Sequence, residues 1–545
     1  MLVALAQEVI LAWGWKRRFI ALLSGAAGAL ALAPVDFLPA MMIPMVCAVW
    51  LIDGCVRETG NSTGHFHEKF IPVVDAAIAG WWMGFGYFVA GLWWLGAAFL
   101  VEVDQFAWAL PLGVLGLPAI LACFFAFGFG IARLLWSPGA ARVFALVAGL
   151  AAAEWLRGNI LTGFPWNALG MSLAGNIVSG QIGSLVGLYG MTILAIAIFA
   201  TPATLADLQV SKRTKLLGLT PTLIAFMATA LILGFGTIRL SGLDAGMVPG
   251  VKLRIVQPNL LQDEKFRPEN RDQILRTYLS VSDRATSPIS TGIGDVTHLV
   301  WPESAFPFIL SRDPEAVRRI AGSLSGRTIL ITGAARQEAP AAGQTRARFF
   351  NSIELVSADG LLPEFYDKRH LVPFGEYLPF SALLEKLRLR QFVHIPGGFD
   401  PGIGPGQLQI PGLPLAAPLI CYEAIFPEAI GPDSPRVDLL LNVTNDGWFG
   451  LTTGPYQHLA QARLRSIEQG VPMIRAANTG ISAMIDPYGR IIGRIALGTQ
   501  GVLDSGLPKS IKPTLFAQFP NLIPLSMWLF TAIFALFGVI RAYRR

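Results

Sequence analysis

The segment Leu415–Glu423, with the sequence LAAPLICYE, joins an apolar run to a cysteine and two polar side chains. A short, uninterrupted apolar run is typical of a buried strand, so we predict a strand from Leu415 to Cys421. A strand end that opens into a turn can present a nucleophile, because backbone N–H groups there are able to hold an oxyanion. A lone cysteine in a buried strand is more often structural, so its surroundings must decide.

Other short runs with strand character surround this segment between residues 241 and 515, where proline, glycine and charge are frequent. Helical patterns alternate with them, at Asp313–Ser323 and Pro455–Gln469. Such alternation indicates an α/β domain. The further strands that we expect are Lys252–Gln257, His298–Trp301, Thr328–Thr332, Phe349–Val356, Asp438–Val443, Met473–Ala476 and Ile481–Ile485, the last paired through the turn Asp486–Gly489.

The sequence on both sides of this domain is that of a membrane protein. Of 545 residues, 53% are hydrophobic and 14% are charged, against roughly 25% charged in a soluble domain. We predict a polytopic α-helical membrane domain with about eight spans, seven in residues 1–240 and one in residues 516–545. Three of the eight runs are shorter than the ~20 residues that a bilayer requires, so two could form a re-entrant pair. The runs lie near residues 19–33, 37–52, 77–101, 106–133, 143–156, 180–204, 216–237 and 520–540.

Basic residues beside these runs predict the orientation of the chain. By the positive-inside rule, both termini are cytoplasmic and residues 241–515 lie on the outer face. Their position beside apolar runs favours anionic lipid headgroups over a nucleic-acid partner. They are Lys16, Arg17, Arg18, Arg133, Arg142, Lys212, Arg213, Lys215, Arg541, Arg544 and Arg545.

Two further polar residues lie where acyl-transfer chemistry would need them. Glu303 lies in Val300–Ser304, VWPES, just past a predicted strand, and Lys368 lies in Phe365–Glu376, FYDKRHLVPFGE. A carboxylate, an ammonium group and a thiol provide the base, cation and nucleophile that transfer through a thioester requires. Each residue alone has an ordinary structural explanation, but together they predict an acyl-transfer site.

These segments resemble the nitrilase superfamily in sequence and in order. The resemblance is carried by WPE at residues 301–303, YDKRHLVPFGE at 366–376 and CYE at 421–423, with NVTNDGWFG at 442–450 and RAANTGIS at 475–482 downstream. The membrane setting narrows the resemblance to the apolipoprotein N-acyltransferase family, and it then covers almost the whole chain. It implies a four-layer αββα sandwich for the domain at residues 241–515.

The resemblance also implies a role for each site residue. Cys421 is the nucleophile, Glu303 the general base and Lys368 the oxyanion and orientation group. Three supporting residues are implied beside this triad, namely Glu376, Tyr422 and Glu423.

The reaction and its partners follow from the same resemblance. A phospholipid donates an acyl chain to the cysteine, and the free α-amino group of the N-terminal diacylglyceryl-cysteine of an apolipoprotein then displaces the thioester as an amide. This ping-pong chemistry uses neither a metal nor an organic cofactor. We expect a monomer in the bacterial inner (cytoplasmic) membrane, with the catalytic domain in the periplasm and no nucleic-acid partner.

Two other functions fit part of the sequence. A membrane-tethered nitrilase-type amidase would use the same triad on a small amide, but it would not need eight spans. A transporter or receptor that has lost catalysis is disfavoured, because all three triad residue types are present and the spans lack buried polar clusters.

Two segments are candidates for lipid contact. Leu383–Val393 mixes apolar and basic residues as an interfacial lid would, and a plain surface helix or loop fits equally well. The loop Thr162–Asn167 could line an acyl entry, although interfacial anchoring by its aromatic residues is the simpler interpretation.

The remaining features are interpreted as structural. The serine-hydrolase pattern GxSxG occurs at Gly60–Gly64 without a preceding strand, so we reject it. Glu154 near the end of a span is expected to be snorkelling or structural. Solvated-loop or packing roles are assigned to His65, His67, Glu68, Cys47, Cys55 and Cys123, since neither a zinc site nor a disulfide framework fits their spacing.

Overall fold

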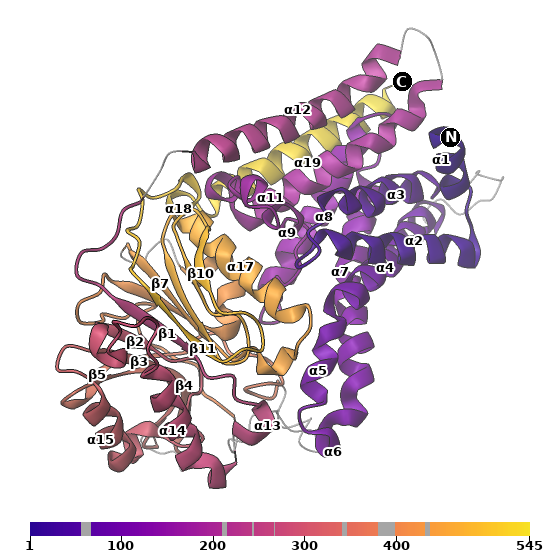
Figure 1. Ribbon diagram of the computed structural model, residues 1–545. Helices are drawn as coiled ribbons and strands as arrows, with labels where there is room; N and C mark the ends of the chain where they lie inside the picture. Colours follow the sequence, from indigo (N-terminus) through magenta and orange to yellow (C-terminus); the bar gives the residue numbers. More distant parts are fainter. Residues whose placement is uncertain are drawn as a thin grey trace. The chain divides into compact units, whose positions relative to one another are not determined.

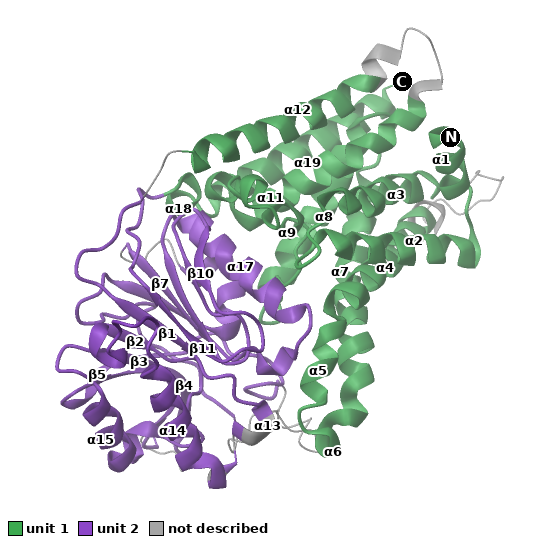
Figure 2. Cartoon of the chain, in the orientation of Figure 1, with its two compact units in different colours: residues 1–243, 514–545 green, residues 244–513 purple. Residues whose placement is uncertain are grey.

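A computed structural model of the chain divides into two compact units, which Figure 2 colours separately. The first unit comprises Met1–Leu243 with Thr514–Arg545, and the second comprises Asp244–Pro513. The structure describes residues 1–55, 67–209, 215–241, 245–265, 267–340, 346–379, 398–430 and 436–544.

The first unit is helical throughout its described residues (Figure 1). Short α-helical turns and 3₁₀ segments connect the longer helices, among them α5 (Gly96–Phe99), α6 (Val103–Phe106) and α18 (Leu515–Gln518). The longer helices are α1 (Leu2–Ile10), α2 (Gly14–Gly28), α3 (Met42–Asp53), α4 (His67–Leu92), α7 (Leu117–Leu134), α8 (Ala141–Asn159), α11 (Gly183–Ala200), α12 (Lys215–Leu240) and α19 (Leu522–Tyr543).

Five helical segments of the described residues are long and apolar enough to cross a membrane. The predicted helical membrane domain is therefore confirmed, but the predicted count of eight spans is not. Segment Leu38–Asp53 is shorter, α2 has 15 residues with three basic ones near its start, and α8 contains three charged side chains. The five are Ile71–Phe99, Val103–Leu134, Gly183–Asp207, Leu219–Leu240 and Leu522–Tyr543.

Two oppositely charged side chains near the end of α8 form a buried ion pair. Glu154 and Arg157 are 1% and 0% exposed at their side chains, and two hydrogen bonds of 3.0 and 2.9 Å join them. Arg157 also donates to the carbonyl oxygens of Phe164 and Trp166, and Glu154 accepts from the backbone N–H of Leu169. Glu154 is thus structural, because the ion pair holds the loop that follows α8.

The second unit contains two mixed β-sheets in its described residues. In the first sheet the order is β11-β1-β2-β3-β4-β5, and in the second it is β10-β9-β8-β7-β6. Strands β1, β2 and β3 are parallel, as are β6, β7 and β8, whereas the flanking strands pair antiparallel. The strands are β1 (Leu253–Gln257), β2 (His298–Val300), β3 (Ile329–Glu338), β4 (Arg348–Ser357), β5 (Gly360–Asp367), β6 (Ala416–Ile420), β7 (Leu439–Thr444), β8 (Met473–Ala477), β9 (Ala483–Ile485), β10 (Ile491–Arg494) and β11 (Gly501–Ser505).

Three apolar layers hold this unit together and make it an αββα sandwich, as predicted (Figure 1). The central layer lies between the sheets and includes Ile255, Ile353, Leu441 and Ile474. Helices α14 (Arg271–Ser282) and α15 (Pro314–Ser323) pack on the first sheet. Helix α17 (Gly454–Gln469) packs on the second. Burial of these faces supplies the main driving force for folding.

The two ends of the second unit pair with each other. Val248 donates its backbone N–H to Leu507, and Lys509 donates to Gly246, on either side of an antiparallel bridge between Met247 and Pro508. The chain therefore enters and leaves this unit at one place.

Candidate active site

The three predicted site residues each follow a strand. Glu303 lies in the loop after β2, Lys368 directly follows β5 and Cys421 directly follows β6. Strand β5 runs parallel to β2, because β5 pairs antiparallel with β4, β4 pairs antiparallel with β3, and β3 pairs parallel with β2. The carboxyl ends of parallel strands lie at one edge of a sheet, where clefts commonly form.

Lys368 is held between two carboxylates. Its side chain is 1% exposed, and its Nζ lies 3.0 and 2.9 Å from the two carboxylate oxygens of Glu376 and 3.7 Å from Oε1 of Glu303. Burial alone would lower the pKa of Lys368, but Glu376 and Glu303 outweigh it and raise that pKa well above the ordinary value. Lys368 is thus a permanent cation.

Glu303 is fixed by amide donors. Oε1 accepts from the side chain of Asn351 at 2.7 Å, and Oε2 accepts from the backbone N–H of Asn445 at 2.9 Å. Asn351 donates to Glu376 as well, also at 2.7 Å, so one amide group links the two carboxylates beside Lys368. The main-chain oxygen of Glu303 accepts from Lys265, whose pKa burial lowers to about 7.

The backbone around Glu303 requires a glycine on the neighbouring strand. A Cβ added at Gly333 of β3 would lie 2.5 Å from the Cα of Glu303 and 2.7 Å from the carbonyl oxygen of Pro302. Both atoms belong to the main chain, so neither could move aside cheaply. Gly333 therefore determines how closely the Glu303 loop approaches the sheet.

Cys421 begins a 3₁₀ turn with a left-handed backbone, at φ +51°. This conformation costs roughly 1–3 kcal/mol for a residue other than glycine and must be held by its surroundings. The thiol is buried, and burial together with Glu303 raises its pKa far above the ordinary value, while Lys368 and the hydroxyl of Thr444 lower it. The thiol is therefore protonated at rest and needs a base in order to react.

Glu423 joins the cysteine turn to the lysine segment. Its Oε2 accepts from the backbone N–H of Ile420, and its Oε1 accepts from the hydroxyl of Tyr366 and the backbone N–H groups of Arg369 and His370, at 2.8–3.1 Å. Burial raises the pKa of Glu423, and the three backbone N–H groups and the charge of Lys368 partly offset that rise.

Tyr422 lies in a small aromatic group. It is buried, and its ring lies 5.7 Å from that of His370 and 5.1 Å from that of Phe426. The rings of His370 and Phe426 stack at 3.9 Å. The structure thus packs the residue after the cysteine against the segment that carries Lys368.

Comparison with known proteins gives the family. A model of the apolipoprotein N-acyltransferase N-terminal domain matches residues 24–201, and a carbon-nitrogen hydrolase model matches residues 252–514. Proteins named apolipoprotein N-acyltransferase are similar over nearly the full length. That of Rhodopseudomonas palustris is 49% identical over 96% of this chain and 95% of its own, and that of Bradyrhizobium diazoefficiens is 48% identical over 94% and 93%. That of Brucella suis is 43% identical over 100% and 99%.

The chain belongs to the apolipoprotein N-acyltransferase family. The family resemblance predicted from the motifs is thereby confirmed. Membership makes the chain a membrane protein with acyltransferase activity.

Three residues that contact this site were not singled out from the sequence, namely Asn351, Lys265 and His458. Asn351 lies in a strand that also contains Ser352 and Glu354, so its polarity gave no distinct signal. The sequence contains no signal for Lys265, because its environment depends on a contact with the main chain of Glu303, which lies 38 positions away. His458 lies on a predicted helix without a motif of its own, although its partner Asp446 lies in NVTNDGWFG.

Other candidate segments do not add to the site. Trp166, expected as an interfacial anchor, is instead 2% exposed and packs against Trp94 with ring centroids 4.9 Å apart. Gly60–Gly64, His65 and Leu383–Val393 lie outside the described residues, as do the side chains of His67 and Glu68.

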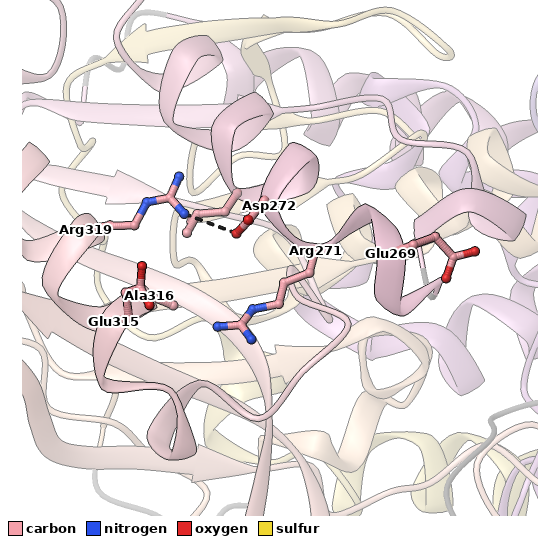
Figure 3. Close-up of a pocket in the computed structure, with 7 residues that line it drawn as sticks. Glu269, Arg271, Asp272, Glu315, Ala316 and Arg319 are labelled. Carbon is pink, nitrogen blue, oxygen red and sulfur yellow. Dashed lines mark hydrogen bonds and ion pairs between the residues drawn. The ribbon is translucent and has the colours of Figure 1, made fainter.

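A polar hollow of ≈ 250 Å³ on the second unit contains none of the triad residues. It lies between α14 and α15, and Figure 3 shows Arg319 joined there to Asp272. Its charged groups include both signs, and Arg319 and Asp272 among them form an ion pair at 3.3 Å. The hollow therefore has no single charge to select a ligand.

Proposed function

We propose that this chain transfers a fatty acyl group from a membrane phospholipid to the free α-amino group of the N-terminal diacylglyceryl-cysteine of an apolipoprotein. The observation that carries the proposal is the buried group of Glu303, Lys368 and Cys421 in a chain with long apolar helices. The names of its relatives support the lipoprotein acceptor.

In the first half-reaction, Glu303 takes the thiol proton as Cys421 Sγ attacks the ester carbonyl of the phospholipid. Lys368 and the backbone N–H of Tyr422 stabilise the oxyanion that forms. The ester C–O bond then breaks, Glu303 returns the proton to the departing alkoxide, and a lysophospholipid leaves. An acyl thioester remains on Cys421.

In the second half-reaction, the neutral α-amine of the acceptor attacks the thioester carbonyl and gives its proton to Glu303. The C–S bond breaks, an amide forms and the sulfur recovers the proton. Glu376 contributes by holding Lys368 in place as a cation, since its carboxylate contacts Nζ through both oxygens. Glu423 and Tyr422 support the cysteine turn.

The proposal includes the setting of the reaction. Both termini lie in the cytoplasm, and residues 241–515 face the periplasm from the bacterial inner membrane. Every proposed catalytic group comes from one chain, so a monomer would be sufficient for the reaction.

The test is the mass of the intact protein after incubation with a defined phospholipid. We expect Cys421 to gain one acyl chain, and a diacylglyceryl-cysteine peptide to remove it as an N-acyl peptide. Cys421→Ser should gain no thioester and release no product. Transfer at an undiminished rate by Cys421→Ser would overturn the proposal, and hydrolysis of a small amide without lipid would favour the amidase.

A further inference from the structure

A histidine from α17 contacts the main chain of the cysteine. Nε2 of His458 lies 3.0 Å from the carbonyl oxygen of Cys421, and Nδ1 lies 2.8 Å from Oδ1 of Asp446. A carbonyl oxygen only accepts hydrogen bonds, so Nε2 donates to Cys421, while Nδ1 lies between Oδ1 of Asp446 and Nη2 of Arg475, the latter at 3.3 Å. The side chains of His458 and Asp446 are 0% exposed.

Arg475 holds this carboxylate from the other side. Oδ2 of Asp446 accepts from Arg475 at 2.8 Å, and Oδ1 accepts from the hydroxyl of Thr444 at 2.9 Å. Burial alone would raise the pKa of Asp446, but Arg475 and His458 lower it to about 2. A Cβ added at Gly480 would lie 2.3 Å from Oδ2, so the carboxylate has little room to move.

Because of the geometry of the peptide bond, these contacts also fix the direction of a backbone N–H group. The carbonyl of Cys421 and the N–H of Tyr422 belong to one planar trans peptide and point in opposite directions. A hydrogen bond that holds the carbonyl therefore also sets the direction of that N–H. The left-handed backbone of Cys421 makes such a restraint necessary, because the residue would otherwise relax to a commoner conformation.

We infer that His458 is a positioning residue, which aims the backbone N–H of Tyr422 at the oxyanion formed during acyl transfer. Asp446 and Arg475 act behind it by fixing the ring. The inference rests on the proposed function, since it assumes that Cys421 is the nucleophile. His458 itself touches no substrate atom.

The experiment compares two variants of the full-length protein in single-turnover acylation by phospholipid. His458→Leu removes the donor and should slow acylation ~100-fold, the effect typical of a lost oxyanion donor, with the KM for phospholipid unchanged. His458→Gln keeps an N–H donor on a side chain of similar reach and should recover most of the rate.

A second measurement separates positioning from general packing. Alkylation of Cys421 by iodoacetamide needs no oxyanion donor, so its rate should stay within about twofold of wild type in both variants. His298 is the matched control, because it is buried and its Nε2 contacts a main-chain oxygen, that of Pro411 at 2.8 Å, outside the triad. His298→Gln should leave acylation unchanged.

The outcomes are distinct. Equal acylation rates in wild type and His458→Leu would overturn the inference, as would a parallel fall in alkylation that His458→Gln does not reverse. If His458→Leu does not fold, Asp446→Asn takes its place, with a ~10-fold slower acylation expected and an unchanged rate overturning the inference. Absence of any thioester in the wild type would instead refute the proposed function.

Discussion

The thiol of Cys421 is protonated at rest, because burial and the negative charge of Glu303 raise its pKa. Only the thiolate alkylates, so the reaction of Cys421 with iodoacetamide should keep rising about tenfold per pH unit through pH 9. Peptide-level mass spectrometry of the segment that contains Cys421 would follow this rate. A plateau near pH 7 would contradict the protonated resting state.

Glu303→Gln should change alkylation and acyl transfer in opposite directions. Loss of the negative charge lowers the pKa of Cys421, so alkylation at pH 9 should become faster than in wild type. Loss of the proposed base should slow acyl transfer ~100- to 10,000-fold. Both rates can be measured on one preparation, and a fall in both would indicate that the variant has disturbed the fold.

At the scale of the element, β3 permits the approach of the Glu303 loop through Gly333. Gly333→Ala would place a methyl group against two main-chain atoms and push the loop away from the sheet. We expect acyl transfer to fall at least ~10-fold, in line with the sensitivity of catalysis to misplacement. Gly322→Ala on α15 is the control, because nothing lies within 4 Å of its added Cβ and transfer should not change.

The loop after α8 depends on the buried pair of Glu154 and Arg157. Arg157→Met leaves the carboxylate buried without its partner, which typically costs about 3–5 kcal/mol. The thermal midpoint of the detergent-solubilised protein should therefore fall clearly. Lys16→Met removes an ion pair whose partners, Lys16 and Glu8, are more than half exposed, and should leave the midpoint nearly unchanged.

The elements that the sequence predicted are those with an apolar signal of their own. The strands around residues 253–257, 416–420 and 439–444 are buried along their whole length, and their apolar runs marked them. Strand β5 was missed because only one of its residues is buried and because it is held by antiparallel pairing with β4. Strand β6 ends at Ile420, one residue before the predicted end, because Cys421 turns into the left-handed region.

The site was predictable only in part for a similar reason. Motifs identified the triad candidates, since each lies in a distinctive segment beside a strand end. The motifs did not identify Asn351, His458 or Lys265. Each of these residues contacts a segment that lies 37 to 48 positions away in the sequence, and the contact of His458 also depends on the packing of α17 on the second sheet. Those contacts arise from tertiary packing, which local periodicity does not encode.

At the scale of the whole molecule, orientation is the next measurable property. Ile289 in the second unit and Tyr543 near the end of α19 are both strongly exposed, at 90% and 85%. In intact spheroplasts, Ile289→Cys should react with a membrane-impermeant maleimide, whereas Tyr543→Cys should react only after lysis. The reverse pattern would place the catalytic unit in the cytoplasm and exclude the proposed acceptor.

The pairing of residues 246–248 with 507–509 bears on how such a chain can arise. A folded domain whose first and last residues lie side by side can be inserted into one loop of another protein without distorting either fold. Here the hydrolase-like sandwich would be the inserted domain, and α12 and α18 would be the helices on either side of the insertion. A single insertion would thus be enough to join the hydrolase-like unit to the helical unit, with no rearrangement of its own strands.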